Sequence, residues 1–379
     1  MLAVANNPDL DARRHRRGEA GAQVYAAGLW PDPALSLDLA HPTTGGARTN
    51  GLDSGISYAL QRLVTRGTDI AAARARARQV DLELLWQEWQ VIQRSRLLRV
   101  RVLTTRRRLQ LLTAARNRYH RYYDQSRRLL AQGALTLKTA AAVATGWFDL
   151  EARVRAERRR LVRQRHALRA LLGLAPDAAL PLAPLAKTPP PVEIPPATWN
   201  QLPRRRPDLR ALQAGYQGQE LRLHSAILAR FPAIELGLTH GRDTDAVYTS
   251  GLGLRLDLPL FSGNRGPIAR ARATRARLRA EYQARLTRTR NDIALLQARD
   301  RLLRQQRAVL RRRLPQLEAL VEDARQARAR GNLPALDLLN LETSLLDRRL
   351  EQVDLDQSLR RIHIALDTLL AWPATRTHR

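Results

Sequence analysis

The sequence predicts a mainly α-helical protein with a small transmembrane β part. Duplicated hairpins of long helices would form a helical barrel, and each chain would add four strands. Three observations predict this fold class. Residues 248–262 alternate between apolar and polar side chains, residues 68–132 contain nothing that breaks a helix, and short motifs recur after 198 or 199 residues.

The stretch at 248–262 predicts a strand with two chemically different faces. Its central residues are Leu252, Gly253, Leu254, Arg255, Leu256, Asp257, Leu258, Pro259 and Leu260. A period of two places alternate residues on opposite faces of a strand, and the run is as long as the ~9–11 residues that cross a membrane. The lipid-facing residues would be Leu252, Leu254, Leu256 and Leu258, and the lumen-facing ones Arg255 and Asp257. An edge strand of a soluble sheet is the alternative that this segment alone leaves open.

Three further stretches alternate in the same way, at residues 35–39, 56–60 and 234–238. Together the four predicted strands form β-hairpins at 34–62 and 233–261, the first with a Gly- and Thr-rich loop at 41–55. Four strands cannot close a barrel, and open sheet edges are not tolerated in lipid. A membrane location would therefore require an oligomer, in which two chains supply eight strands and three supply twelve.

Long helices account for most of the chain. The composition from residue 68 to residue 132 is dominated by Ala, Leu, Arg, Gln and Glu, which predicts a helix roughly 95 Å long at ~1.5 Å per residue. A helix of that length does not fit inside an ordinary globule and indicates a coiled coil or a helical barrel. Gly133 interrupts it, and a second helical pattern runs to Leu172. Residues 175–203 are Pro-rich and predict an extended linker.

After the linker the sequence repeats its plan. Asn7-Pro8-Asp9-Leu10 returns 199 residues later as Arg206-Pro207-Asp208-Leu209, and Gly133 returns 198 residues later as Gly331. We therefore predict a first structural repeat at 1–174, the linker at 175–203 and a second repeat at 204–379. Each repeat would contain a helix, a β-hairpin and a long-helix hairpin with its tip near residue 133 or 331. The second long helix would run from about residue 267 to residue 330.

Composition argues against several function classes. The chain has no cysteine, so it has no disulfide and no thiolate metal ligand, and its eight histidines are scattered. We find no phosphate-binding loop, metal-ligand spacing or nucleophile motif, and we expect no enzyme activity, metal site or cofactor. The net charge is +30, and all basic residues except Lys138 and Lys187 are arginine. Such a charge is typical of nucleic-acid binding, so an Arg-rich coiled-coil nucleic-acid-binding or scaffold protein is the alternative.

The order of these features resembles the outer membrane efflux protein family, the TolC-like channels, and within it the heavy-metal efflux branch. The residues that carry the resemblance are Asn7-Pro8-Asp9-Leu10, Ala27-Gly28-Leu29-Trp30-Pro31-Asp32-Pro33, Arg205-Arg206-Pro207-Asp208-Leu209, Leu258-Pro259-Leu260-Phe261-Ser262-Gly263-Asn264-Arg265, and the tips at 131–135 and 329–333. The resemblance covers nearly the whole chain, and its specificity comes from the order and the duplication of these motifs.

The resemblance implies a homotrimer that closes a twelve-stranded β-barrel in the outer membrane, with a helical barrel continuing through the periplasm. Its partners would be outer-membrane lipid, a periplasmic adaptor protein and an inner-membrane pump, without nucleic acid. Together they would export metal ions, drugs or other small solutes. The adaptor-contact tips would be Gly133, Leu135, Gly331 and Leu333. Asp337 would narrow the aperture behind them, although the matching position in the first repeat is Thr139.

Two features do not follow simply from this resemblance. The first residues lack the basic start and apolar core of a secretion signal, and because the resemblance begins almost at residue 1 we expect a truncated or misassigned start. The arginines are the second feature. An arginine-lined lumen favours anions, whereas resemblance to metal exporters suggests cations, and the sequence leaves both cargo classes open.

Overall fold

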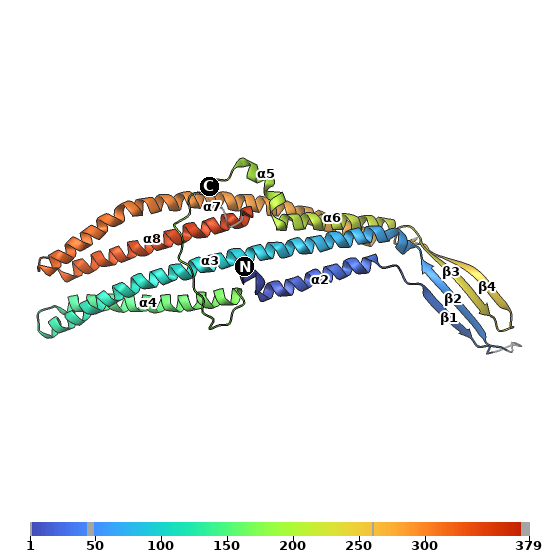
Figure 1. Ribbon diagram of the computed structural model, residues 1–379, viewed down its shortest axis with the longest axis horizontal. Coiled ribbons are helices and arrows are strands. Elements are labelled where there is room, and N and C mark those ends of the chain that lie inside the picture. Colours follow the sequence, from blue (N-terminus) through green and yellow to red (C-terminus); the bar gives the residue numbers. More distant parts are fainter. Residues whose placement is uncertain (1, 44–48, 260, 373–379) are drawn as a thin grey trace. The chain divides into compact units, whose positions relative to one another are not determined.

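The computed structural model describes residues 2–43, 49–259 and 261–372, and it consists of long helices and one small sheet (Figure 1). The predicted fold class, mainly α with four antiparallel strands, is confirmed. In chain order the elements are α1 (Leu2–Ala5), α2 (Pro8–Gly28), β1 (Ala34–Ala40), β2 (Gly51–Ala59), α3 (Gln61–Ala131), α4 (Leu137–Leu171), α5 (Pro196–Arg205), α6 (Pro207–Leu228), β3 (Ala233–Arg242), β4 (Tyr248–Asp257), α7 (Arg265–Ala329) and α8 (Ala335–Leu370).

The helices begin and end close to the predicted positions. The longest, α3, has 71 residues, and α7 has 65. Each ends two residues before the glycine that was predicted to interrupt it. None of the described helices is both long enough and apolar enough to cross a membrane.

Two segments differ from the sequence prediction. β2 begins at Gly51, inside the predicted loop, because residues 51–55 pair with β1 on one side, and residues 52–55 with β3 on the other. The end of the predicted extended linker is the helix α5, whose first turn starts at a proline and whose Leu202 is fully buried. Proline suits the first turn of a helix because the backbone N–H that it lacks would have no hydrogen-bond acceptor within the helix at that position. Part of the 41–55 loop, residues 44–48, lies outside the described residues.

The chain divides into two compact units that cut across the predicted repeats. Unit 1 comprises Met1–Asp11, Gln87–Leu202 and Arg288–Arg379, and unit 2 comprises Ala12–Trp86 and Pro203–Thr287. Each unit therefore takes segments from both halves of the sequence. The boundaries of the predicted repeats stay a prediction about the sequence.

Unit 2 contains the sheet, with the strand order β1-β2-β3-β4 and every pair antiparallel (Figure 1). The central pair joins β2 from the first half of the chain to β3 from the second. Hydrogen bonds between these two strands therefore hold the two predicted hairpins in one sheet. Within the same unit, α6 packs on α7 through the buried residues Leu223, Ile268 and Ala271.

The core of unit 1 lies where α3, α4 and α8 meet. Its buried residues recur at intervals of seven, as Leu112 and Tyr119 on α3, Val143 and Leu150 on α4, and Leu339 and Leu346 on α8. A seven-residue apolar repeat keeps one seam of each helix toward its neighbours, as in a coiled coil. The predicted coiled-coil character of the long helices therefore has its physical basis in this seam.

Candidate functional site

The sheet of unit 2 has one apolar face, and no described element covers it. Leu256 lies opposite Ile234, Leu254 opposite Leu236 and Leu252 opposite Leu238. Leu252, Leu254 and Leu256 are 76%, 60% and 47% exposed. Full burial of a leucine is worth about 1.5–3 kcal/mol, so in water this face would leave a large stabilisation unused. A face of this kind is suited to contact with lipid.

The opposite face of the same strands is polar. Arg255 lies opposite Glu235 and forms an ion pair with it at 3.6 Å. The Ser57 hydroxyl, on the neighbouring strand β2, donates a hydrogen bond to the same Glu235 carboxylate. Asp257 is exposed at the end of β4, and Leu258 follows it with 57% exposure. Leu260, which the sequence also placed in this strand, lies outside the described residues.

Both outer edges of the described sheet lack a neighbouring strand within the chain. β1 pairs only with β2, and β4 pairs only with β3. Unpaired backbone N–H and C=O groups are costly in hydrocarbon because no water can satisfy them. In a membrane, these two edges would have to pair with strands of other chains.

The two helix-hairpin tips of unit 1 have the same backbone geometry. Gly133 and Gly331 have φ of 70° and 83°, which is the left-handed region that glycine enters without a Cβ clash. Gly133 N–H donates to Leu130 O at 3.0 Å, and Ala134 N–H donates to Leu129 O at 2.9 Å. Gly331 and Asn332 repeat both bonds at 3.0 and 2.9 Å. This is the Schellman motif, and it satisfies the last carbonyls of both long helices.

A cleft of about 490 Å³ lies between the two tips. Leu135 and Gly331, both predicted from the sequence, line it together with Thr139. Leu129 and Leu338 supply apolar lining, and the side chains of Arg325 and Arg328 supply positive charge. The structure thus brings one residue from each predicted tip to a single cleft.

The other predicted tip residues lie outside the lining of this cleft. Leu333 is half-buried, and its carbonyl accepts a hydrogen bond from Arg328 Nη1 at 3.2 Å. Asp337 is exposed in the first turn of α8, and its side chain makes no hydrogen bond or ion pair with a described residue. Its carboxylate is therefore free to act on solutes or on neighbouring chains.

A glutamate behind the tips holds one of the cleft arginines. Arg325 donates from Nη2 to the nearly buried carboxylate of Glu342 at 2.8 Å and from Nη1 to Glu322 at 3.1 Å. Burial by itself lowers the pKa of Arg325, but the hydrogen bonds to Glu342 and Glu322 more than offset this and raise the pKa above its ordinary value. Arg325 is therefore a fixed positive charge beside the cleft.

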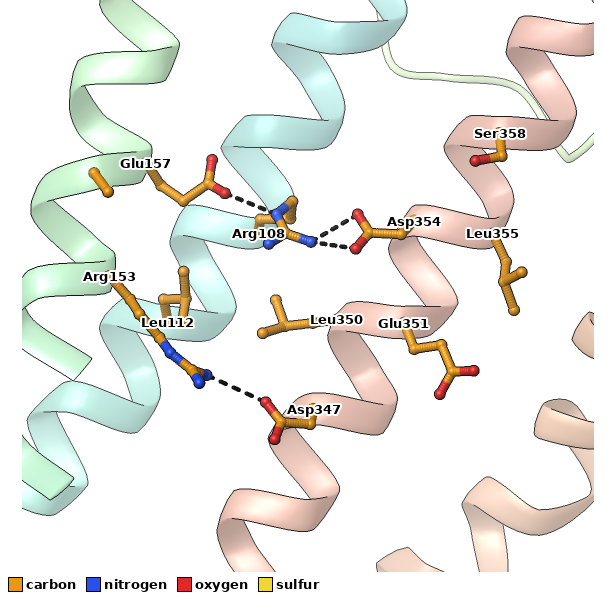
Figure 2. Close-up of a pocket in the computed structure, with 11 residues that line it drawn as sticks. Arg108, Leu112, Arg153, Glu157, Asp347, Leu350, Glu351, Asp354, Leu355 and Ser358 are labelled. Carbon is orange, nitrogen blue, oxygen red and sulfur yellow. Dashed lines mark hydrogen bonds and ion pairs between the residues drawn. The ribbon is translucent and has the colours of Figure 1, made fainter. Parts of the chain in front are cut away.

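A second cluster of charges joins α3, α4 and α8 farther along unit 1 (Figure 2). Arg108 of α3 donates from Nε to Glu157 of α4 at 2.9 Å and from Nη1 to both carboxylate oxygens of Asp354 of α8 at 2.6 Å. Arg153 of α4 donates to Asp347 of α8 at 3.2 Å. The cluster lines a cavity of about 510 Å³. Sequence reasoning missed it, because ion-paired arginines look like any others in an Arg-rich helix.

The charge of Arg108 is held firmly in this cluster. Burial lowers the pKa of Arg108, and the hydrogen bonds to Glu157 and Asp354 outweigh burial and raise it. The Glu157 side chain is almost fully buried, and its Oε2 has no hydrogen-bond partner among the described residues. Glu157 therefore depends on its arginine neighbours for compensation of its charge.

An aromatic stack near the first tip was also missed. Trp147 of α4 stacks on Tyr123 and His120 of α3 with ring centroids 4.7 and 5.1 Å away. A comparison of the two repeats in the sequence could have revealed this stack. At the matching positions of the second half, 198 residues on, Tyr123 is replaced by Val321 and Trp147 by Leu345, so the aromatic residues distinguish the first tip hairpin from the second.

The repeated Pro-Asp motif has a structural use in both copies. Arg206 and Asp208 are each 4% exposed in side chain and form a salt bridge at 2.7 Å, with the Arg206 guanidinium over the Trp86 ring at 4.9 Å. In the first copy, the Asn7 side chain accepts the Leu10 N–H at 3.0 Å. Both motifs therefore stabilise the start of a helix that leads toward the sheet.

The chain combines one amphipathic sheet with two paired long-helix hairpins, and this is the architecture of TolC-like outer-membrane channels. CusC, whose reported structures concern transmembrane channel formation, superposes with a TM-score of 0.81 at 19% identity over 97% of this chain and 90% of that one. The outer membrane protein VceC from Vibrio cholerae superposes with a TM-score of 0.79 at 18% identity, over 97% of this chain and 94% of that one. The CmeC outer membrane channel of Campylobacter jejuni superposes with a TM-score of 0.83 at 16% identity, over 97% of this chain and 84% of that one.

Residues 199–371 match the family model described as outer membrane efflux protein. This match confirms, for that region, the resemblance to the outer membrane efflux protein family that was recognised from the sequence. The family is one of channel proteins. No curated protein matches the chain by sequence.

Proposed function

We propose that this protein is the outer-membrane channel of a tripartite efflux system, without enzyme activity of its own. It would work with a periplasmic adaptor and an inner-membrane pump to carry metal ions, drugs or other small solutes out of the cell. The observation that carries the proposal is the sheet with an uncovered apolar face and two unpaired edges. The match of residues 199–371 to the outer membrane efflux protein model supports it.

The sheet supports a homotrimer as the functional unit. One chain supplies four strands whose outer edges are free, and three chains would supply twelve. A closed barrel removes every edge and places the leucine face toward lipid and the Arg255 face toward water. The helices of unit 1 would then extend the conduit into the periplasm.

The tips support docking to an adaptor. Gly133 and Gly331 allow each helix pair to reverse direction, and the cleft between the tips offers Leu135 within an apolar and cationic lining. An adaptor that inserts an apolar side chain there would bury surface from both hairpins at once. Leu333 would add a contact beside the cleft, and Asp337 would narrow the aperture behind it.

Localisation is the experiment that tests this proposal directly. The chain is expressed behind the secretion signal of another outer-membrane protein, and the cell envelope is fractionated. We expect the protein in the outer-membrane fraction as a detergent-extracted species that changes mobility on heating, because a closed β-barrel resists unfolding until heated.

The matched control is the same fusion with charged residues placed in the apolar core of the added signal, so that the signal no longer works. We expect it to be retained inside the cell, which separates the effect of targeting from that of the fold. Recovery of the signal-bearing form only in the cytosol, with no heat-modifiable species, would show that the proposed function is wrong and would favour the Arg-rich scaffold alternative.

A further inference from the structure

Unit 1 has one face that is crossed by the linker. Arg99 of α3 donates to the carbonyls of Ala183 and Pro184 at 2.8 and 2.9 Å. Farther along, Thr188 donates to Asp356 of α8 at 3.0 Å, and Arg304 of α7 donates to Pro189 O at 3.0 Å. Through these contacts the linker runs along one side of α3, α7 and α8, and its trace crosses the same helices in Figure 1. We call this side the strapped face.

The opposite side of α3 and α8 carries a different set of charges. Successive helical residues are about 100° apart, so positions two apart point to opposite sides and positions seven apart to the same side. Arg101 is two residues from Arg99, and Asp354 is two residues from Asp356. Arg101 and Asp354 therefore belong to the side away from the linker, which we call the bare face.

Charged residues run along the bare face in columns with a spacing of seven. The columns are Arg94, Arg101 and Arg108 on α3, Arg153 and Arg160 on α4, and Asp347, Asp354 and Arg361 on α8. At the end nearer the tips the columns neutralise one another, through the pairs Arg108–Asp354 and Arg153–Asp347 described above (Figure 2). At the other end, α8 supplies an arginine in place of an aspartate.

The arginines at that end have no compensating carboxylate of their own. The side chains of Arg94, Arg101 and Arg361 make no ion pair or hydrogen bond with any residue that the structure describes. Arg160 approaches only Glu157, at 3.7 Å, and shares it with Arg108. These four residues, Arg94, Arg101, Arg160 and Arg361, form a zone that we call the arginine zone.

The arginines of this zone are close enough to interact. Burial lowers the pKa of Arg101, and its cationic neighbours Arg361, Arg160 and Arg94 lower it further. Arginine still stays protonated at neutral pH. The zone is therefore a concentrated positive charge, because its one described carboxylate contact is the Glu157 that Arg160 shares with Arg108. Anions are its natural counter-ions.

We propose that the arginine zone lines the lumen of the channel and selects anionic solutes as its cargo. The inference rests on the proposed function, since it needs a channel with an inner wall. The wall built from unit 1 has two faces, and a linker strapped across the inner one would obstruct the bore. The bare face is therefore the face left for the lumen, and a trimer would place three copies of the zone around it.

The test is ion selectivity of the purified full-length channel in planar bilayers, from the reversal potential across a gradient of dilute potassium chloride. Dilute salt is needed because the Debye length is only ~10 Å at 0.1 M. Asp337→Asn serves as the background, because a ring of aperture carboxylates would otherwise oppose the anion preference. We expect a chloride-to-potassium permeability ratio above one, and a roughly two- to tenfold fall in this ratio with Arg101→Gln and Arg361→Gln together.

A matched control removes the same charge from the other face. Arg107 and Arg360 are the sequence neighbours of Arg108 and Arg361, and they line a cleft on the strapped side together with Leu185 of the linker. Arg107→Gln with Arg360→Gln should leave the permeability ratio unchanged. The single change Arg94→Gln, at an exposed position, serves if the double variant does not assemble, and it too should lower the ratio.

Three outcomes are distinguishable. A cation-selective channel in the Asp337→Asn background overturns the inference while leaving the proposed function intact. The same holds if the strapped-face pair lowers the ratio as much as the bare-face pair. Purified outer-membrane protein that forms no conducting pore overturns the proposed function itself, and this inference with it.

Discussion

A Leu256→Arg channel is expected to lose most of its assembled oligomer from the outer membrane, whereas an Arg255→Leu channel should assemble nearly as well as the unmodified protein. Leu256 lies on the uncovered apolar face, opposite Ile234. An arginine on the lipid face near the bilayer midplane costs about 2–4 kcal/mol per strand, and a trimer would carry this penalty three times. The measurement is the amount of heat-modifiable oligomer in purified outer membranes.

Arg255→Leu is the control because it replaces arginine by leucine on the polar face, whereas Leu256→Arg replaces leucine by arginine on the apolar face. Arg255 is 75% exposed in side chain and pairs with Glu235 at 3.6 Å. Loss of such an exposed pair costs about 0–1 kcal/mol, and Ser57 still donates to Glu235. Leu256→Met tests the position itself and should be neutral. Equal tolerance of arginine at 256 and leucine at 255 would count against a membrane barrel.

Gly331→Val is expected to abolish efflux while leaving normal amounts of oligomer in the outer membrane. Gly331 has φ of 83°, a conformation that a β-branched residue adopts only with strain. The substitution should therefore distort the Schellman turn at the second tip and the cleft beside it, far along the chain from the sheet that assembles the barrel. Leu333→Asp should have the same effect by placing a charge at the proposed adaptor contact. Resistance to a panel of metals and antibiotics, in cells that contain the adaptor and pump, is the measurement.

Gly331→Asn tests whether the position needs a positive φ or needs glycine itself. Asparagine enters the left-handed region more readily than other residues with a side chain, so this variant should retain most of the efflux activity. If Gly331→Val and Leu333→Asp both leave resistance unchanged at normal channel levels, the tips are ordinary helix ends and the adaptor-docking proposal is wrong.

Asp337→Ala should produce a different phenotype from the tip variants. The Asp337 side chain is exposed and makes no polar contact within the described chain, so its removal should not destabilise the fold. We expect the cells to become permeable to antibiotics that the closed channel normally excludes, because the proposed aperture loses its ring of charge. Asp337→Glu keeps the charge and should remain tight. Unchanged antibiotic entry with Asp337→Ala would remove this residue from the aperture.

The candidate site was predictable where a pattern along the chain determines geometry without help from other segments. Glycines between two helical stretches identified both tips, because only a residue free to adopt positive φ closes a Schellman turn. The Arg108 cluster was not predictable in this way. Its partners, Glu157 and Asp354, lie 49 and 246 residues away in sequence, and only the packing of α3 with α4 and α8 brings the three groups together.

The sequence by itself determined the elements of this protein, because period-two and period-seven patterns report which residues share a face within one strand or one helix. Tertiary structure decided what those faces meet. Pairing with β1 and β3 made a strand of the glycine- and serine-containing residues 51–55, whose own propensity favours a loop. Binding of the linker to Arg99 likewise distinguished the two sides of α3. Arg99 and Arg101 are the same residue type in the same helix, and only the position of another segment sets one against the linker and the other on the bare face.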